Sequence, residues 1–561
     1  MEFHVSQSTG DDDRAGTHEK PFASITRAAE VAVPGDSVVV HEGVYRERVN
    51  PPRGGESHER RITYRAARGE TVAICGSEAV SGWTLWKGNV WKVDIPNEQF
   101  GSFNPFATEL AGDWFDPRDH SHHRGMVFLD GHWMVEADSL DEVYESCSDQ
   151  SQTVRFWFAD VTEDATTLYA DFGGGDPNAS LVEVTTRESV FYPDTSWCDY
   201  ITVDGFRLRH AATPWAPPTA EQIALIGTHW SRGWIIENNE ISYSRCAGLS
   251  LGKYGDAWDN TSADTAAGYV ATIERGLENG WDYDRVGSHT VRNNVIHHCE
   301  QAGIVGSLGA IGSLIERNEV HSIHVIRRFG GAEQAGIKLH APLKTTIRDN
   351  RVHHANRGLW LDWMTQSTRV TGNLFYDNDL NQDFFAEVNH GPYLVDNNIF
   401  LSRISIRDQS ESGVYAYNYI AGEIQCAAEH RRDTPWQEAD STALAGLAPT
   451  RGGDNHFYGN TFAGPGDVAE TEPREVGLHS PAWKSGYGLA MYNTSALPCR
   501  AAGNRYVAGA RPFGDELHDA DSDAFLERGD GVDLRHLGQT AVSCLPFRRA
   551  APTDEVVYRR L

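Results

Sequence analysis

Two acidic side chains stand among large aromatic residues in short segments of similar pattern. Asp362 follows Trp360 in "GLWLDW" (358–363), and Glu387 follows Phe385 in "DFFAEV" (383–388). Two carboxyl groups held close together, one ionised and one protonated, are what cleavage of a glycosidic bond requires. Trp and Phe add apolar faces on which a sugar ring can stack. This chemistry requires a fold that brings the two acids together.

Both acids keep the same distance to a recurring asparagine. Asp362 precedes Asn373 by 11 residues, and Glu387 precedes Asn398 by 11. In stacked coils, equal positions of successive strands lie about 4.8 Å apart. Side chains alternate along a strand, so both acids face outward while neighbours such as Leu361 face the interior. Two carboxylates at this spacing repel, and we expect one of them to keep its proton.

The same alignment predicts a wider outward column. Its members alternate with apolar residues in "GIKLH" (336–340), "GLWLD" (358–362), "DFFAE" (383–387) and "ISIRD" (404–408). We expect one face of the fold to carry Lys338, His340, Trp360, Asp362, Phe385, Glu387 and Arg407. A single outward acid is usually only solvated, whereas this column of acids and aromatic residues favours a sugar site.

A repeated segment indicates the fold. The pattern apolar-x-x-Asn-x-apolar recurs around Asn239, Asn294, Asn318, Asn350, Asn373, Asn398, Asn418, Asn460 and Asn504, with spacings that include 24, 23, 25 and 20 residues. A fixed period in this range is typical of a stacked solenoid, and β-branched and aromatic residues in alternation favour strands. Asparagines at equal turns can hydrogen-bond in a ladder. We predict an all-β protein, a right-handed parallel β-helix of the pectate-lyase-like type.

Three segments follow from where the pattern starts and stops. Residues 1–77 are expected to form an N-terminal cap and the first coils of the β-helix. A short helix through Ile25, Ala28, Ala29 and Ala32 should cover the open end of the solenoid. Between residues 78 and 196 the asparagine pattern vanishes and hairpin-forming segments predict an inserted antiparallel β-sandwich. Residues 197–561 are expected to form the main β-helix with C-terminal coils.

Composition narrows the partners. The chain of 561 residues has a formal charge of -30, which argues against nucleic acid and anionic membrane surfaces as partners. No signal-peptide layout or membrane-length apolar run is visible, so we expect a cytoplasmic protein. The eight cysteines form no CxxC motif, and "HSHH" (120–123) lacks metal-ligand spacing. We therefore expect no metal and no cofactor.

At the quoted segments the sequence resembles glycoside hydrolase family 120, the β-xylosidases built on a β-helix with an inserted β-sandwich. The resemblance rests on "GLWLDW", "EVNHGPYLVDNN", "AGIKLHA", "HAATPWAPPTA", "RRITYRAA" and "FNPF…GDW", and extends to about residue 465. It implies that Asp362 is the nucleophile and Glu387 the general acid and base. Glu333 matches an auxiliary carboxylate, and Trp114 an aromatic residue that closes over the substrate.

We expect further substrate contacts from His340, Trp360, Trp215, Lys338 and His390. The predicted function is that of a retaining exo-β-1,4-xylosidase that releases xylose from the non-reducing end of xylo-oligosaccharides. Loops 213–222 and 253–270 are expected to close one end of the site. The resemblance also implies a homo-oligomer, perhaps a tetramer.

Two alternatives come from other classes. A polysaccharide lyase on the same scaffold would use Lys338 or Arg407 with a bound Ca²⁺ to act beside a uronate. The paired acids and aromatic residues suit a neutral sugar better. A non-catalytic carbohydrate-binding solenoid would bind without turnover, and the acid pair argues against it.

Overall fold

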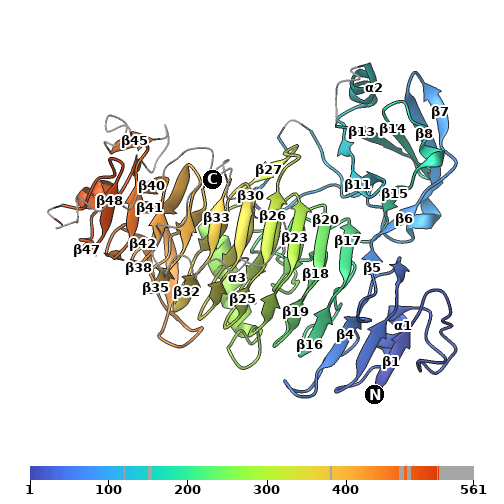
Figure 1. Cartoon of the computed structure of the whole chain (residues 1–561), viewed down its shortest axis with the longest axis horizontal. Coiled ribbons are helices and arrows are strands. Elements are labelled where there is room, and N and C mark those ends of the chain that lie inside the picture. The colour runs from blue at the N-terminus through green and yellow to red at the C-terminus, as the bar shows by residue number, and fades with distance from the viewer. Residues whose placement is uncertain are drawn as a thin grey trace.

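Three long sheets, each taking one strand from almost every coil, run the length of the molecule (Figure 1). The computed structural model describes residues 1–118, 120–148, 154–378, 382–466, 473–476, 482–514 and 516. The sheets have 13, 12 and 10 strands. The predicted parallel β-helix is therefore what the chain forms, and the last part of the predicted segment 197–561 lies outside the described residues.

The first two sheets are parallel throughout. The 13-stranded sheet consists, in spatial order, of β1 (Glu2–Val5), β2 (Ser37–Val40), β4 (Ile62–Ala66), β16 (Ile201–Asp204), β19 (Ile235–Glu237), β22 (Thr290–Arg292), β25 (Leu314–Glu316), β29 (Thr346–Arg348), β32 (Thr368–Thr371), β35 (Tyr393–Asp396), β38 (Gly413–Ala416), β43 (His456–Tyr458) and β47 (Arg500–Ala502). The 12-stranded sheet consists of β3 (Gly43–Tyr45), β5 (Val72–Cys75), β17 (Arg207–Ala211), β20 (Glu240–Ser244), β23 (Val295–Cys299), β26 (Glu319–Ile323), β30 (Arg351–Ala355), β33 (Leu374–Tyr376), β36 (Ile399–Phe400), β39 (Tyr419–Ile420), β44 (Thr461–Ala463) and β48 (Arg505–Val507).

The third sheet carries the predicted acids. It consists of β18 (Ile226–Gly227), β21 (Ala247–Ser250), β24 (Ala302–Ser307), β28 (Ala335–His340), β31 (Leu359–Asp362), β34 (Phe384–Glu387), β37 (Ile404–Asp408), β40 (Glu423–Cys426), β46 (Trp483–Gly486) and β45 (Arg474–Val476). The order is parallel as far as β40, after which β46 and β45 join antiparallel. Its inward side chains, among them Ile337, Leu339, Leu359, Leu361 and Phe384, are fully buried in the solenoid core. Every second side chain of these strands is buried, so a shift of one residue would expose them. This burial fixes the register between neighbouring strands.

The asparagine ladder is present as predicted. Each amide nitrogen from Asn239 to Asn460 donates to the side-chain oxygen of the next asparagine, at 2.9 to 3.1 Å. The backbone N–H of the same residues donates to that oxygen as well. Because all nine residues are buried, these bonds satisfy polar groups that water cannot reach.

A short helix covers the first coil. Helix α1 (Ile25–Val31) begins at Ser24, whose side chain accepts a hydrogen bond from the N–H of Arg27. Ile25, Ala28 and Ala29 are buried within the solenoid core, as the sequence predicted. The helix thus closes the end of the hydrophobic interior.

Two small sheets follow the first coils and project from one end of the solenoid (Figure 1). One contains β11 (His132–Trp133), β10 (Val127–Leu129), β15 (Val182–Thr185) and β6 (Ser77–Ala79), and the other β12 (Val135–Glu136), β13 (Phe156–Val161), β14 (Ala165–Asp171), β8 (Val90–Pro96) and β7 (Thr84–Lys87). They share a core that includes Trp83, Val127, Trp157 and Val182, so they form a sandwich. The pairing is antiparallel except between β12 and β13, and α2 (Leu140–Ser148) packs on β13 and β14.

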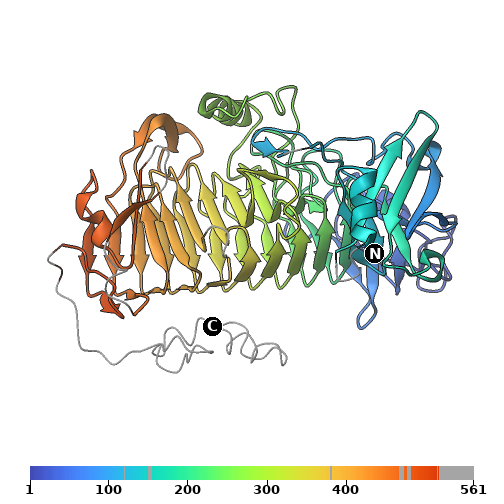
Figure 2. The ribbon, with the colours of Figure 1, turned by 90° about the horizontal axis from the view of Figure 1, so that it is seen from above.

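Three insertions cover the third sheet. Helix α3 (Ala266–Glu278) and the hairpin of β41 (Glu429–Gln437) and β42 (Leu444–Thr450) lie on the same side of the solenoid (Figure 2). Strand β9 (Phe115–Asp116) pairs with β27 (Gly330–Gly331) and brings the chain near Trp114 to the same side. Within the described ranges, no helix has the length and apolar character needed to cross a membrane.

Candidate active site

One outward column of the third sheet brings the predicted acids into register. Ser307 pairs with His340, His340 with Asp362, and Asp362 with Glu387, each on the neighbouring parallel strand. Register partners on neighbouring strands lie about 4.8 Å apart. The insertions cover this column, and Asp362 and His340 are only 4% and 3% exposed. The acids therefore face away from the solenoid core but are shielded from bulk water.

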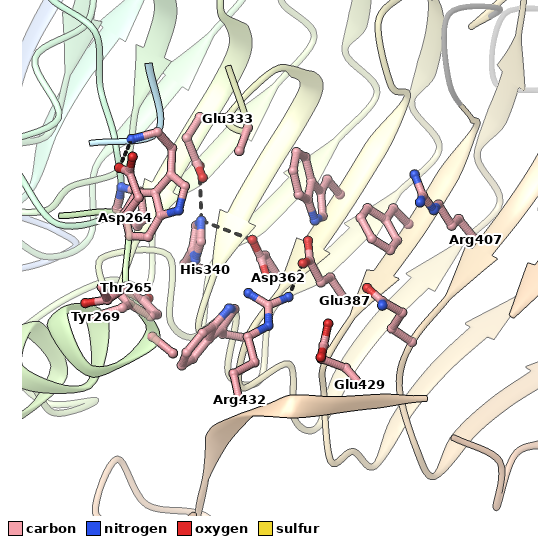
Figure 3. Close-up of a pocket in the computed structure, with 18 of the residues that line it drawn as sticks. Asp264, Thr265, Tyr269, Glu333, His340, Asp362, Glu387, Arg407, Glu429 and Arg432 are labelled. Carbon is pink, nitrogen blue, oxygen red and sulfur yellow. Dashed lines mark hydrogen bonds and ion pairs between the residues drawn. The ribbon is translucent and has the colours of Figure 1, made fainter. Parts of the chain in front are cut away.

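The column lies at the floor of a cavity of about 790 Å³. Figure 3 shows the acids between the helix α3 side and the hairpin side of this cavity. Its lining consists of Trp114, Pro218, Asp264, Thr265, Ala266, Tyr269, Ala332, Glu333, His340, Arg357, Trp360, Asp362, Trp363, Phe385, Glu387, Arg407, Gln409, Glu429, Arg431, Arg432 and Trp483. Loop 213–222 contributes Pro218 to the wall of the cavity. Loop 253–270 contributes Asp264, Thr265, Ala266 and Tyr269. Both loops therefore lie in the wall where they were expected.

The two oxygens of Asp362 have different surroundings. Oδ2 accepts a hydrogen bond from Lys338 Nζ at 2.6 Å and lies 3.5 Å from His340 Nε2. Oδ1 is buried and has no hydrogen-bond partner among the described residues. An unpartnered carboxylate oxygen in a buried site is unusual and points to a ligand-facing role.

Glu333 lies beside this pair as a third carboxylate. Its Oε2 is 3.2 Å from His340 Nε2 and 3.5 Å from Lys338 Nζ. Burial raises the pKa of Glu333, but the charges of Lys338 and His340 lower it more, so the pKa lies below its usual value. Glu333 is therefore ionised at neutral pH, and Lys338 is shared between two buried carboxylates.

The cluster of Glu333, His340 and Asp362 also has donor atoms that a metal ion could use. Ligand atoms of Glu333, His340 and Asp362 lie within 4.8 Å of one another, which is a spacing that a cation could use. The ammonium of Lys338 contacts both carboxylates and supplies the positive charge there. This donor set therefore suits the lysine that it already holds better than an additional divalent ion.

Glu387 meets the hairpin that covers the site. Its Oε1 accepts a short hydrogen bond from Arg432 of β41, and the guanidinium of Arg432 lies 5.6 Å from the centre of the Trp363 ring. Burial lowers the pKa of Arg432, but Glu387 and Asp362 raise it more, so the arginine is charged. The side chain of Glu387 keeps 13% exposure, which gives it access to the cavity.

Aromatic residues form the walls. Trp360 and Phe385 stack with ring centres 5.2 Å apart, and Trp360 Nε1 is buried without a hydrogen-bond partner in the described chain. Trp114 enters from the segment after the sandwich sheet strand β8, with a left-handed φ of 58°, and its backbone N–H donates to the carboxylate of Asp264. Tyr269 of α3 packs edge-on against His340 at 5.1 Å.

Three of the predicted substrate contacts lie elsewhere. Trp215 is 2% exposed and donates to the carbonyl of Asp113, so it supports the wall from behind rather than lining the cavity. His390 belongs to the turn that follows β34. Its Nε2 lies within hydrogen-bond distance of Thr434, and His390 is not among the residues that line the cavity. Lys338 contacts Asp362 and is not among the lining residues, so a contact of Lys338 with substrate stays a prediction.

Several lining residues were missed because they come from insertions without the repeat. Arg431 and Arg432 lie in the hairpin between Asn418 and Asn460, where the spacing is much longer than one coil. Tyr269 lies in α3, between Asn239 and Asn294. The long spacings marked the insertions, but nothing in them indicated which side chains turn toward the column.

Comparisons with known proteins agree with this fold and site. The model of the insertion domain of glycoside hydrolase 120 matches residues 80–184, and that of the right-handed β-helix region matches residues 223–462. The solved complex of XylC with xylose has 40% sequence identity and a TM-score of 0.86, over 95% of this chain and 88% of that chain.

More distant relatives add less. A solved glycoside hydrolase with 13% identity covers 83% of this chain and 96% of that chain at a TM-score of 0.53, which reflects the fold alone. The uncharacterised protein YwoF of Bacillus subtilis (strain 168) is 35% identical over 72 residues, 13% of this chain. The alignment spans 15% of the length of that curated relative.

A right-handed β-helix whose covered outer column holds paired carboxylic acids between aromatic walls is the design of a glycoside hydrolase. The inserted domain and the extended identity to XylC narrow the class further. The chain belongs to glycoside hydrolase family 120, and the predictions of the family and of the β-helix fold are confirmed.

Proposed function

We propose that the protein is a retaining exo-β-1,4-xylosidase that releases xylose from the non-reducing end of xylo-oligosaccharides. The observation that carries the proposal is the register of Asp362 with Glu387 on adjacent parallel strands at the cavity floor. A strand spacing of about 4.8 Å matches the separation of about 5–5.5 Å that retaining enzymes use. The similarity to XylC, which was solved with xylose, supports the choice of sugar.

Asp362 acts as the nucleophile. Lys338 and His340 hold Oδ2, which leaves Oδ1 free to attack the anomeric carbon. Attack forms a covalent glycosyl-enzyme ester while the bond to the leaving oxygen breaks. The ammonium of Lys338 pairs with the carboxylate of Asp362 and offsets its charge in a buried site.

Glu387 acts first as acid and then as base. It gives its proton to the leaving glycosidic oxygen, and in the second step it takes a proton from the water that displaces Asp362. Two inversions at one carbon return the original anomeric configuration. Arg432 donates to Oε1 of Glu387, so this arginine orients the carboxyl group toward the cavity.

The xylose ring lies on the His340 side of Asp362. Trp360 Nε1 and His340 Nδ1 have no hydrogen-bond partner among the described residues and are available to sugar hydroxyls. Glu333, ionised beside His340, accepts from further hydroxyls. Trp114 offers an aromatic face above the ring.

Exo action follows from the closed end of the cavity. Asp264 and the start of α3 stand beyond His340 (Figure 3). Trp114 lines the same cavity, and its backbone N–H donates to Asp264. In this proposal these residues block extension of the substrate past one sugar. A substrate can then enter only with its non-reducing end first. The homo-oligomeric state and the cytoplasmic location are further proposals, which light scattering and cell fractionation test.

NMR of the first-formed sugar tests the reaction. With xylobiose and with aryl β-xylosides, we expect β-xylose to appear before mutarotation. First appearance of α-xylose would show inversion and reject the nucleophilic role of Asp362. A lyase would instead give an unsaturated product from a uronate polymer and lose activity in a chelator. Lys338 is bonded to Asp362 and therefore poorly placed for the proton abstraction that such a lyase needs.

A further inference from the structure

Two guanidinium groups in the cavity lack a carboxylate partner. The other cationic side chains in or beside the cavity are paired. Lys338 pairs with Asp362 and Glu333, Arg432 with Glu387, and Arg431 with Glu429. In the part of the chain that the structure describes, neither Arg357 nor Arg407 forms an ion pair, and the Nε atom of each is buried without a hydrogen-bond partner. Buried charges are normally paired, so an unpaired couple in a ligand cavity calls for a ligand.

Aromatic rings hold both groups in place. The guanidinium of Arg357 lies 4.3 Å from the centre of the Trp360 ring, and its Nη1 donates to the carbonyl of Gln334 at 3.1 Å. Arg407 lies 3.9 Å from the Trp483 ring and 5.2 Å from the Phe385 ring. Stacking fixes the planes of the guanidinium groups while it leaves N–H donors free at the edges.

The two arginines lose charge stability on burial. Burial lowers the pKa of Arg357 to about 10, the charge of Arg407 lowers it further, and nearby carboxylates, Glu387 first among them, oppose this. Burial also lowers the pKa of Arg407, and the charge of Glu387 opposes this. An anion between them would relieve both effects, because it restores the charge balance that burial removes.

Arg407 lies on the side from which the leaving group departs in the proposed reaction. Arg407 is the register partner of Phe385 on β37, one coil beyond the strand of Glu387 and two beyond that of Asp362. Figure 3 shows Arg407 past Glu387, on the side opposite to His340 and Asp264. If Glu387 protonates the glycosidic oxygen, the leaving sugar occupies this side.

We propose that Arg357 and Arg407 bind a carboxylate of the leaving sugar, so that the favoured substrates are xylo-oligosaccharides with a uronic acid next to the bond that is cleaved. This inference rests on the proposed function and names its substrate class. The chain as a whole carries a charge of -30, so the attraction is local and must overcome long-range repulsion, which salt screens. One carboxylate between two guanidinium groups suits such a site, whereas a polyanion does not.

The test compares two trisaccharides that differ only in one group. Both have a non-reducing xylose β-1,4-linked to a xylose that carries an α-1,2 substituent, which is glucuronic acid in one and glucose in the other. We expect the wild-type protein to release xylose from the acidic compound with a kcat/KM at least about tenfold higher. Arg407→Gln and Arg357→Gln should bring the ratio close to one, and Arg407→Lys should keep part of it. Arg403→Gln, an exposed change in the segment just before β37, should keep the full ratio.

Calorimetry separates this inference from the proposed function. If neither compound releases xylose, the xylosidase assignment fails. The carboxylate site is still supported if the wild-type protein binds the acidic trisaccharide about tenfold more tightly than the neutral one and Arg407→Gln loses this preference. Equal kcat/KM and equal affinity for the two compounds would overturn it. So would tight binding of inorganic phosphate together with equal affinity for the trisaccharides, because the site would then take any small anion. An unsaturated uronate product would overturn both proposals in favour of a lyase.

Discussion

Lys338 donates a 2.6 Å hydrogen bond to Oδ2 of Asp362, while Oδ1 of the same carboxylate has no partner among the described residues. The two residues lie on neighbouring strands, two positions out of register, since Asp362 pairs with His340 and Lys338 with Trp360. The contact orients the carboxylate and compensates part of the charge of Asp362 and Glu333.

Removal of Lys338 should leave two buried carboxylates facing each other. We expect Lys338→Met to lower kcat for xylobiose about 10²-fold or more, because repulsion between Glu333 and Asp362 favours a protonated and unreactive nucleophile. The double variant Lys338→Met/Glu333→Gln should recover part of this loss. Steady-state kinetics of the single and double variants measures the coupling. Strictly additive losses would contradict a shared charge balance.

The roles of the two acids can be separated by azide. Asp362→Ala and Glu387→Ala should each lower turnover of xylobiose by about 10³-fold or more. With an activated aryl xyloside, Glu387→Ala plus azide should give β-xylosyl azide, because the glycosyl-enzyme still forms. Asp362→Ala plus azide should give the α-anomer, because azide replaces the nucleophile. NMR of the products decides, and exchanged anomers would reverse the assignment.

Trp114 should act through its link to Asp264. We expect Asp264→Ala to raise KM for xylobiose about tenfold with a smaller effect on kcat. The backbone N–H of Trp114 loses its acceptor in this variant, so the segment that carries the ring is no longer fixed at the cavity. Glu274→Gln, an exposed change on α3, serves as control and should leave both constants near the wild-type values. A fall in kcat alone would show that Trp114 takes part in the chemistry rather than in binding.

The sandwich should be anchored to the solenoid by a pH-dependent contact. Glu136 of β12 contacts Arg245 and His123. Burial raises the pKa of Glu136, but the charge of Arg245 and hydrogen bonds from His122 and His123 lower it more, to about 2. A depressed folded pKa stabilises the fold above the unfolded value of 4.5, and this contribution is lost as pH falls toward 2. Glu136→Gln should therefore lower the free energy of unfolding by about 3 kcal/mol at pH 7.

Urea unfolding at a series of pH values checks this sign. The difference between wild-type protein and Glu136→Gln should shrink below pH 4.5 and vanish near pH 2. Glu163→Gln, an exposed residue of the same sandwich, should show little difference at any pH. A deficit that stays constant from pH 7 to pH 2 would mean that packing, and not charge, links the two parts.

The ladder should be a measurable part of stability. Asn350 donates to Asn373 Oδ1 at 2.9 Å and to the Ile315 carbonyl at 3.0 Å, and accepts from Asn318. Asn350→Ala should cost about 2–4 kcal/mol, because it leaves buried partners unsatisfied. Asn350→Asp should cost more, since it places a carboxylate against acceptors. Denaturant unfolding measures both, and an equal cost would show that only packing matters.

The repeat and the acids could be predicted from the sequence because both depend on local order. Inward and outward parity follows from alternation, and the equal distances from Asp362 to Asn373 and from Glu387 to Asn398 define the register. The same logic placed His340 and Trp360 beside the acids at the cavity. Parallel coils repeat one hydrogen-bond pattern, so sequence spacing translates directly into spatial neighbours.

Only the tertiary structure decided what covers that column. Helix α3, the β41–β42 hairpin and the segment at Trp114 are insertions whose path depends on packing rather than on period. Trp215 and His390 are not among the residues that line the cavity, because the sequence did not show which side of the wall they occupy. The ion pair of Glu387 with Arg432 and the unpaired Arg357 and Arg407 exist only once distant segments fold over the sheet. Local alternation can specify a column of side chains, whereas the charge balance of a closed site depends on contacts between segments far apart in the chain.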